Sequence, residues 1–89
     1  MKISNYDEQE VEITAVYFRP SNQRQQLETY PKRMLVNGQE YSFMESGMRY
    51  LISKGQDLIK LFDVSDGQNQ YRLKLVGQHW TLVGTKSAT

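Results

Sequence analysis

His79 is the first residue to test for chemistry, because an imidazole can serve as a general base, a partner of a nucleophile or a metal ligand. The chain of 89 residues has one histidine and no cysteine, so a transition-metal site would depend almost wholly on carboxylates. His79 directly precedes Trp80. Alternate residues of a strand face opposite sides, so His79 should face solvent if Trp80 faces the core. We therefore expect a solvent-facing histidine without a catalytic role.

The carboxylates do not form a reactive group either. Asp63 and Asp66 flank a turn, but their spacing is far short of a calcium-binding loop, and Asp66 is expected to serve its turn. Glu10 and Glu12 share a strand face, as residues two apart in any strand do. The six glycines are isolated, one per turn, and form no phosphate-binding loop. The sequence thus predicts no catalytic, cofactor-binding or metal-binding residue, and we expect that the protein is not an enzyme.

Basic and aromatic side chains on strands are the remaining candidates for a binding surface. Arg72 and Lys74 alternate with apolar residues, so both should face outward. Such residues on a curved β-surface can hold single-stranded nucleic acid by stacking and phosphate contacts, but they also keep strand faces soluble. The formal net charge of only +1 favours the second interpretation. The candidate binding surface comprises Lys32, Arg33, Arg49, Tyr50, Arg72 and Lys74.

The elements that must position these residues are short strands joined by tight turns. Residues 10–18 alternate with period two, and Pro20 ends that strand because proline donates no backbone hydrogen bond. Residues 20–26 are predicted to be a loop. Asn37-Gly38 predicts a β-hairpin over residues 31–43, since both residues accept the positive φ of a type I′ turn. Residues 57–64 and 70–76 flank an Asp-Gly loop, and Gly77 turns the chain into a last strand at 79–83.

Residues 47–54 are compatible with either of two structures. A helix would begin at Ser46, place Met48 and Leu51 on one face and stop at Gly55. A strand would follow a turn at residues 45–47 and pair with an antiparallel neighbour. We favour the strand because the surrounding segments are predicted strands.

Together these elements predict an all-β fold, a small antiparallel meander that forms a barrel or a strongly bent sheet of five to seven strands. The length allows a single domain over residues 1–89, with an ordered core at about 10–84 and frayed tails. The predicted core is Val11, Ile13, Tyr17, Leu35, Tyr41, Phe43, Leu51, Phe62, Val64, Leu73, Leu75, Trp80 and Leu82.

One hairpin and the end of the chain resemble a known family. Residues 31–41 read Pro-Lys-Arg-Met-Leu-Val-Asn-Gly-Gln-Glu-Tyr, similar to the pattern Pro-x-Arg-Phe-x-Trp-x-Gly-Arg-x-Tyr. Residues 62–64, 66–67, 71–73 and 80–82 resemble the close of that pattern. It belongs to a small bacterial β-module of unknown function, found alone or as a C-terminal tail of Y-family polymerase-like proteins. The resemblance implies a fold and a genomic setting, and no chemistry.

Compartment and partners follow from what the composition excludes. Small secreted domains often need disulfides, so the lack of cysteine favours the cytoplasm. The longest apolar runs fall far short of a membrane span. We expect a non-catalytic interaction module that binds a protein partner without a cofactor. The alternative is a small β-barrel that binds single-stranded DNA or RNA. The sequence leaves the partner and the oligomeric state open.

Overall fold

The computed structural model describes residues 8–20, 27–45 and 47–87, and it confirms the all-β prediction. No helix within these ranges is long and apolar enough to cross a membrane. The predicted loop at 20–26 lies outside the described residues except for Pro20, which ends a strand. The strands are β1 (Gln9–Glu10), β2 (Glu12–Pro20), β3 (Leu27–Val36), β4 (Gln39–Ser42), β5 (Met48–Lys54), β6 (Asp57–Ser65), β7 (Asn69–Val76) and β8 (His79–Ser87).

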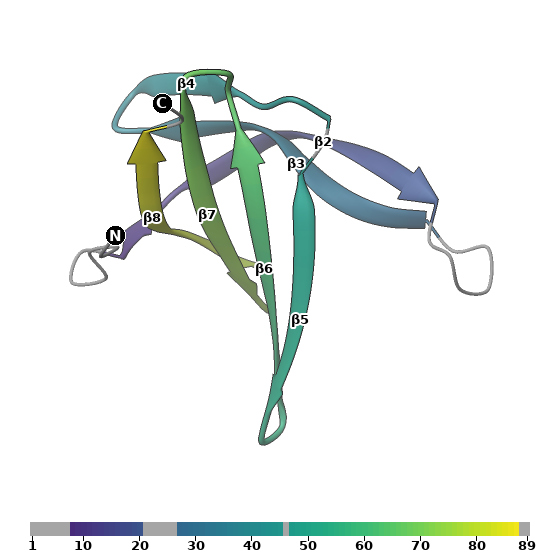
Figure 1. Ribbon diagram of the computed structural model, residues 1–89. Coiled ribbons are helices and arrows are strands. Elements are labelled where there is room, and N and C mark those ends of the chain that lie inside the picture. Colours follow the sequence, from purple (N-terminus) through teal and green to yellow (C-terminus); the bar gives the residue numbers. More distant parts are fainter. Residues whose placement is uncertain (1–7, 21–26, 46, 88–89) are drawn as a thin grey trace.

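The strands form two antiparallel sheets (Figure 1). The five-stranded sheet has the order β1-β8-β7-β6-β5, and the three-stranded sheet has the order β2-β3-β4. The expected barrel is not confirmed, because pairing among the described strands leaves both sheets open. The described residues form eight strands, one more than the upper end of the expected five to seven, because β1 pairs with β8 and is separate from β2.

The chain passes between the sheets at two corners. At the first, Val11 separates β1 from β2, and its backbone N–H donates to the carbonyl of Trp80 over 3.2 Å. At the second, the chain leads from β4 to β5, and the N–H of Met44 donates to the carbonyl of Ser65 over 2.8 Å. A Cβ on Gly47 would lie 2.9 Å from a methyl group of Val64, so only glycine fits there without displacement. These corners let the two sheets face each other.

The hairpin turns confirm the predictions from local sequence. Asn37 and Gly38 have φ values of 51° and 76°, as a type I′ turn requires. Gly77 turns β7 into β8 with a φ of 62°. Residues 48–54 form β5, which confirms the strand and excludes the helix.

The core lies between the facing sheets and contains both aromatic and aliphatic side chains. Phe62 of β6 contacts Tyr30 of the other sheet and Trp80 of β8, with ring centroids 5.7 and 5.2 Å apart. Buried side chains are Tyr30, Met34, Val36, Phe43, Phe62, Val64, Tyr71 and Leu73, with Val11, Ile13, Tyr17, Tyr41, Leu75, Trp80 and Leu82 partly buried against them.

Two predicted core residues are placed differently. Leu35 is only half-buried, because Met34 and Val36 on either side of it face inward. Leu51 is exposed. It lies at the middle of β5, opposite Lys60 in the register of β5 with β6, and this hairpin extends away from the three-stranded sheet (Figure 1). With no sheet facing this part of β5, its side chains stay in solvent.

Candidate interaction surface

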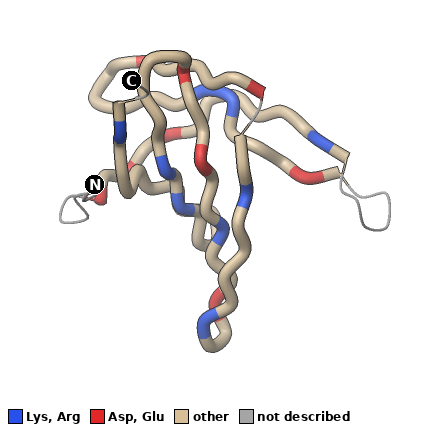
Figure 2. Tube along the Cα trace, viewed as in Figure 1, with Lys and Arg blue, Asp and Glu red and all other residues tan. Residues whose placement is uncertain are grey.

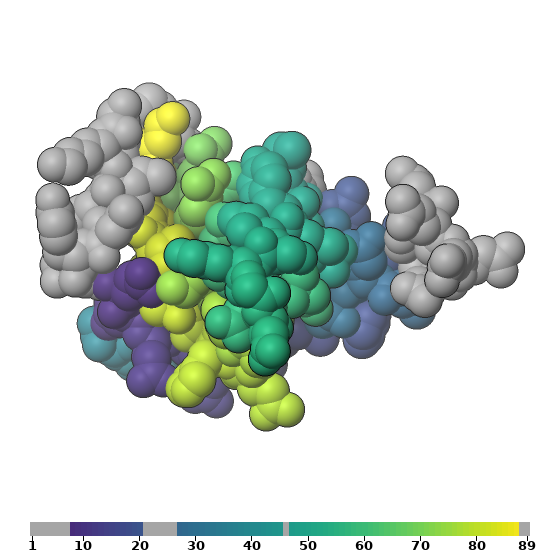
Figure 3. Space-filling view, turned by 90° about the horizontal axis from the view of Figure 1, so that it is seen from below, coloured from purple at the N-terminus to yellow at the C-terminus, as the bar shows by residue number. Residues whose placement is uncertain are grey.

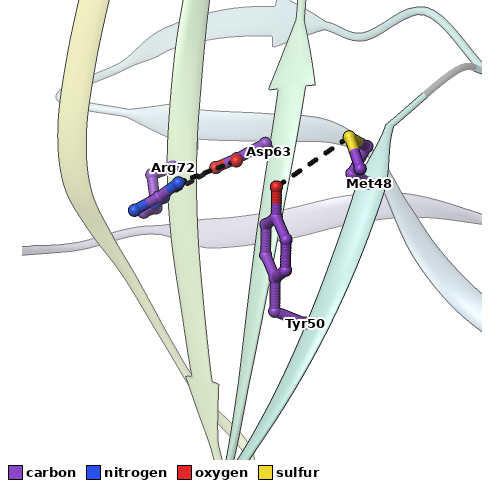
Figure 4. A network of polar contacts seen from close by, with 4 residues as sticks. All are labelled: Met48, Tyr50, Asp63 and Arg72. Carbon is purple, nitrogen blue, oxygen red and sulfur yellow. Dashed lines mark hydrogen bonds and ion pairs between the residues drawn. The ribbon is translucent and has the colours of Figure 1, made fainter.

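The outer face of the five-stranded sheet carries a polar network centred on Asp63 and Arg72. Asp63 lies opposite Arg72 in the register of β6 with β7. Its two carboxylate oxygens accept hydrogen bonds from Nε and Nη2 of Arg72 over 2.7 and 2.8 Å. The Arg72 guanidinium also lies 5.8 Å from the ring centroid of Tyr50 on β5. Figure 4 shows these side chains with Met48, whose sulfur accepts from the Tyr50 hydroxyl over 3.8 Å.

The ion pair shifts the acidity of this network. The Arg72 side chain donates to the Asp63 carboxylate and thereby lowers the pKa of Asp63, which outweighs the opposite effect of partial burial. The same carboxylate raises the pKa of Tyr50, because a phenol beside an anion ionises less readily. At neutral pH the network therefore holds a charged pair and a neutral phenol.

A stability measurement against pH tests this pair. Above the unfolded pKa of Asp63, 3.8, the wild type should exceed Asp63→Asn in free energy of unfolding by about 0.2–1 kcal/mol, the range for a solvent-accessible pair. A carboxyl whose pKa is lower in the folded than in the unfolded state contributes its full stabilisation above the unfolded pKa. That stabilisation is lost as the pH falls through the folded pKa. The difference should therefore shrink below about pH 4 in urea denaturation. Arg72→Gln should remove the same pH-dependent contribution to the free energy of unfolding. If wild type and Asp63→Asn differ by a constant amount down to pH 2, the stabilisation does not come from this ion pair.

A shallow depression of about 430 Å³ adjoins the network. Met48, Asp63, Ser65, Gln70, Arg72 and Lys86 contribute to its lining. Its volume is within the range of small-molecule sites. It is nevertheless open to solvent, and two of its charged side chains, Asp63 and Arg72, are already paired with each other. The depression therefore offers a ligand polar contacts, but Asp63 and Arg72 would have to separate before either could pair with that ligand.

The structure brings together three of the six predicted surface residues. Tyr50, Arg72 and Lys74 lie on the outer face of the five-stranded sheet. Arg49 lies on the opposite face of β5 and forms an ion pair with Glu28 of β3, so it links the two sheets. Lys32 and Arg33 belong to β3 in the other sheet. The six candidate residues therefore lie on different faces and sheets, and only Tyr50, Arg72 and Lys74 share one face.

Carboxylates pair with most of the predicted cations. Lys74 donates to Glu8 over 2.7 Å, in addition to the pairs that Arg49 and Arg72 form. Figure 2 shows positively and negatively charged positions on both sheets. This mixed pattern lowers the positive potential that a phosphate backbone would meet.

His79 and Asp66 lie apart from each other, and each has its own local contacts. His79 is exposed, and its Nδ1 lies 3.4 Å from a carboxylate oxygen of Glu10. Asp66 accepts hydrogen bonds from the backbone N–H groups of Gln68 and Asn69 and from the Tyr71 hydroxyl, all over 2.8 Å. It therefore stabilises its turn. Across residues 8–20, 27–45 and 47–87, no three His, Asp or Glu side chains are grouped as metal ligands.

The most distinctive exposed feature is the edge strand β5, which sequence reasoning missed as a site. β5 forms the end of the five-stranded sheet, and every residue in it except Arg49 is exposed. Met48, Leu51 and Ile52, together with Leu58 at the start of β6, are exposed large apolar residues. Figure 3 shows the teal and green atoms of β5 and β6 uncovered at the centre of this face. The run Tyr50-Leu51-Ile52 was a usable signal, since three consecutive apolar residues must cover both faces of a strand.

Comparisons with known proteins add no relative. No family model, no curated protein and no solved structure matches this chain.

Proposed function

We propose that this chain is a non-catalytic protein-interaction module whose contact surface is the edge of β5 with the exposed apolar residues of the β5–β6 hairpin. The observation that carries the proposal is the grouping of Met48, Leu51, Ile52 and Leu58 on one hairpin. Met48 and Ile52 lie on one face of the hairpin, and Leu51 and Leu58 on the other, so both faces expose apolar side chains beside the open edge. A partner strand added at that edge would contact both sets. The resemblance to the bacterial module and the cytoplasmic location remain predictions beside this proposal.

The backbone of β5 supports the same function. An edge strand presents unpaired N–H and C=O groups that can hydrogen-bond with an added strand. Edges are commonly protected by shortness or by charged side chains. The opposite edge, β1, has two residues, but β5 has seven and carries a free cation only at Lys54, since Arg49 is paired with Glu28. β5 thus lacks the usual protection against strand addition.

Binding of nucleic acid is the second candidate function. It is favoured by the position of Tyr50, Arg72 and Lys74 on one face, with Lys86 at the adjoining depression. Against it, Arg72 and Lys74 would have to leave their carboxylates before they could contact phosphate. We therefore rank it below protein binding.

Photo-crosslinking from single positions tests the proposed function. A p-benzoylphenylalanine at Ile52 should form protein adducts in the cells from which the chain derives. Val16 is the matched control, because it is as exposed as Ile52, at 42%, but lies on the other sheet. Adducts should form from position 52, decrease on addition of Leu51→Lys and be absent from position 16. Equal yields from both positions, or none from position 52, would contradict the proposal.

An NMR titration with short oligonucleotides tests the second candidate. Binding through the outer face should shift the amides of residues 50, 72 and 74, weaken as salt rises and decrease in Arg72→Ala. We expect no shifts at physiological salt. Shifts at those residues that persist there would reverse the ranking of the two functions.

A further inference from the structure

The sequence of β5 is self-complementary about its central residue. When the strand Met48–Lys54 is paired antiparallel with a copy of itself, Leu51 lies opposite Leu51. Tyr50 then lies opposite Ile52, Arg49 opposite Ser53 and Met48 opposite Lys54. All seven residues find a partner in this register, and the three central apolar residues face only apolar residues. A shift by two residues leaves only five pairs and puts Tyr50 opposite Lys54 or opposite a second Tyr50.

We propose that the partner at the β5 edge is a second copy of this chain, paired antiparallel through β5 about a two-fold axis at Leu51. The proposal rests on the proposed function, since it names the occupant of the same edge. It would join two five-stranded sheets into one continuous sheet of ten strands. A two-fold interface of this kind is self-complementary and closes at two copies.

The outer face of the joined sheet supports this register. Tyr50 lies opposite Leu61, and Ile52 opposite Ile59, in the pairing of β5 with β6. In the dimer the row runs from Leu61 through Tyr50 to Ile52 and Ile59 of the second copy, and the two-fold axis repeats it. Each row holds an aromatic side chain against a β-branched one, a favourable cross-strand pair. Exposed apolar side chains of the isolated chain would therefore cover each other.

The inner face and the charges agree with the same placement. Leu51 would contact its own copy, which shields two side chains that are exposed in the single chain. No two like charges lie opposite each other. Lys54 lies opposite Met48 of the second copy, and Met48 pairs on its other side with Asp63. That row continues to Arg72, which already pairs with Asp63, so Lys54 lies directly opposite an uncharged residue.

Cysteine crosslinking tests the register directly, because the chain contains no cysteine. Directly opposed residues of an antiparallel pair have Cβ atoms about 4.5–5.5 Å apart, which is near disulfide geometry. Under mild oxidation, Leu51→Cys should form a covalent dimer at least about tenfold faster than Ile52→Cys or Val16→Cys. A mixture of Tyr50→Cys and Ile52→Cys should give the mixed dimer. If Leu51→Cys is oxidised no faster than Val16→Cys, the proposed register is overturned.

Sedimentation equilibrium of the cysteine-free chain provides the second measurement. The expected mass is twice 10.4 kDa. Leu51→Lys, which places two ammonium groups opposite each other, should raise the dissociation constant about tenfold or more. Since Leu51 is exposed, this variant should keep its amide spectrum. A dimer unaffected by Leu51→Lys would place the interface elsewhere. If the chain is a monomer at all concentrations but position 52 still crosslinks another protein, only the dimer is overturned. If there is neither a dimer nor a crosslink from position 52, the proposed function is overturned as well.

Discussion

Phe62→Ala should lower the free energy of unfolding by about 3–5 kcal/mol. Phe62 is 1% exposed, and its ring lies between Tyr30 of the three-stranded sheet and Trp80 of the five-stranded sheet. Truncation would remove contacts on both sides at once and leave a cavity that two paired sheets cannot easily close. For a domain whose total stability is about 5–15 kcal/mol, such a loss approaches global unfolding.

Urea denaturation at pH 7 measures this effect, with Phe18→Ala as the matched control. Phe18 has the same side chain but is 59% exposed on β2. Its truncation should change stability by less than about 0.5 kcal/mol. Similar losses in the two variants would mean that the space between the sheets is not the main core.

Met34→Ala should cost about 2–5 kcal/mol, the second large effect. Met34 is 0% exposed near the C-terminal end of β3, so the three-stranded sheet presents it to the core in the way that the larger sheet presents Phe62. An unbranched thioether fills irregular gaps, and alanine leaves them empty. The midpoint of urea denaturation should fall accordingly.

Met44→Ala is the control for this variant, because Met44 is 55% exposed beside the second corner. Its truncation should leave the midpoint within about 0.5 kcal/mol of the wild type. A cost for Met34→Ala as small as that for Met44→Ala would be inconsistent with a core shared by both sheets.

The hairpins were predictable because their signals are local. Asn37-Gly38 specifies its turn through the φ values that these two residues tolerate. The same turn also determines which residues share a face. It pairs Val36 with Gln39 and Met34 with Tyr41, so the face of Tyr41 is that of Met34. The sequence analysis assigned both Leu35 and Tyr41 to the core from their hydrophobicity, without using the register across the turn.

The candidate surface was predictable only in part. Arg72 and Lys74 share a face by strand periodicity, and the register of β5 with β6 and β7 adds Tyr50. Arg49 could have been separated from Tyr50 by the same periodicity, since adjacent strand residues face opposite sides. The pairing of Arg49 with Glu28 could not have been predicted from periodicity, because the two residues belong to different sheets and meet only when those sheets face each other.

The sequence by itself determined the strands and their tight turns, because periodicity and turn residues act over a few neighbouring positions. Tertiary structure decided that β1 leaves β2 to join β8, that two sheets form, and that β5 remains an open edge. Strand pairing uses backbone groups that every residue carries, so side-chain identity specifies partners weakly until burial selects among them. Leu51 shows the result: its type is that of a core residue, and its exposure follows from where the facing sheet ends.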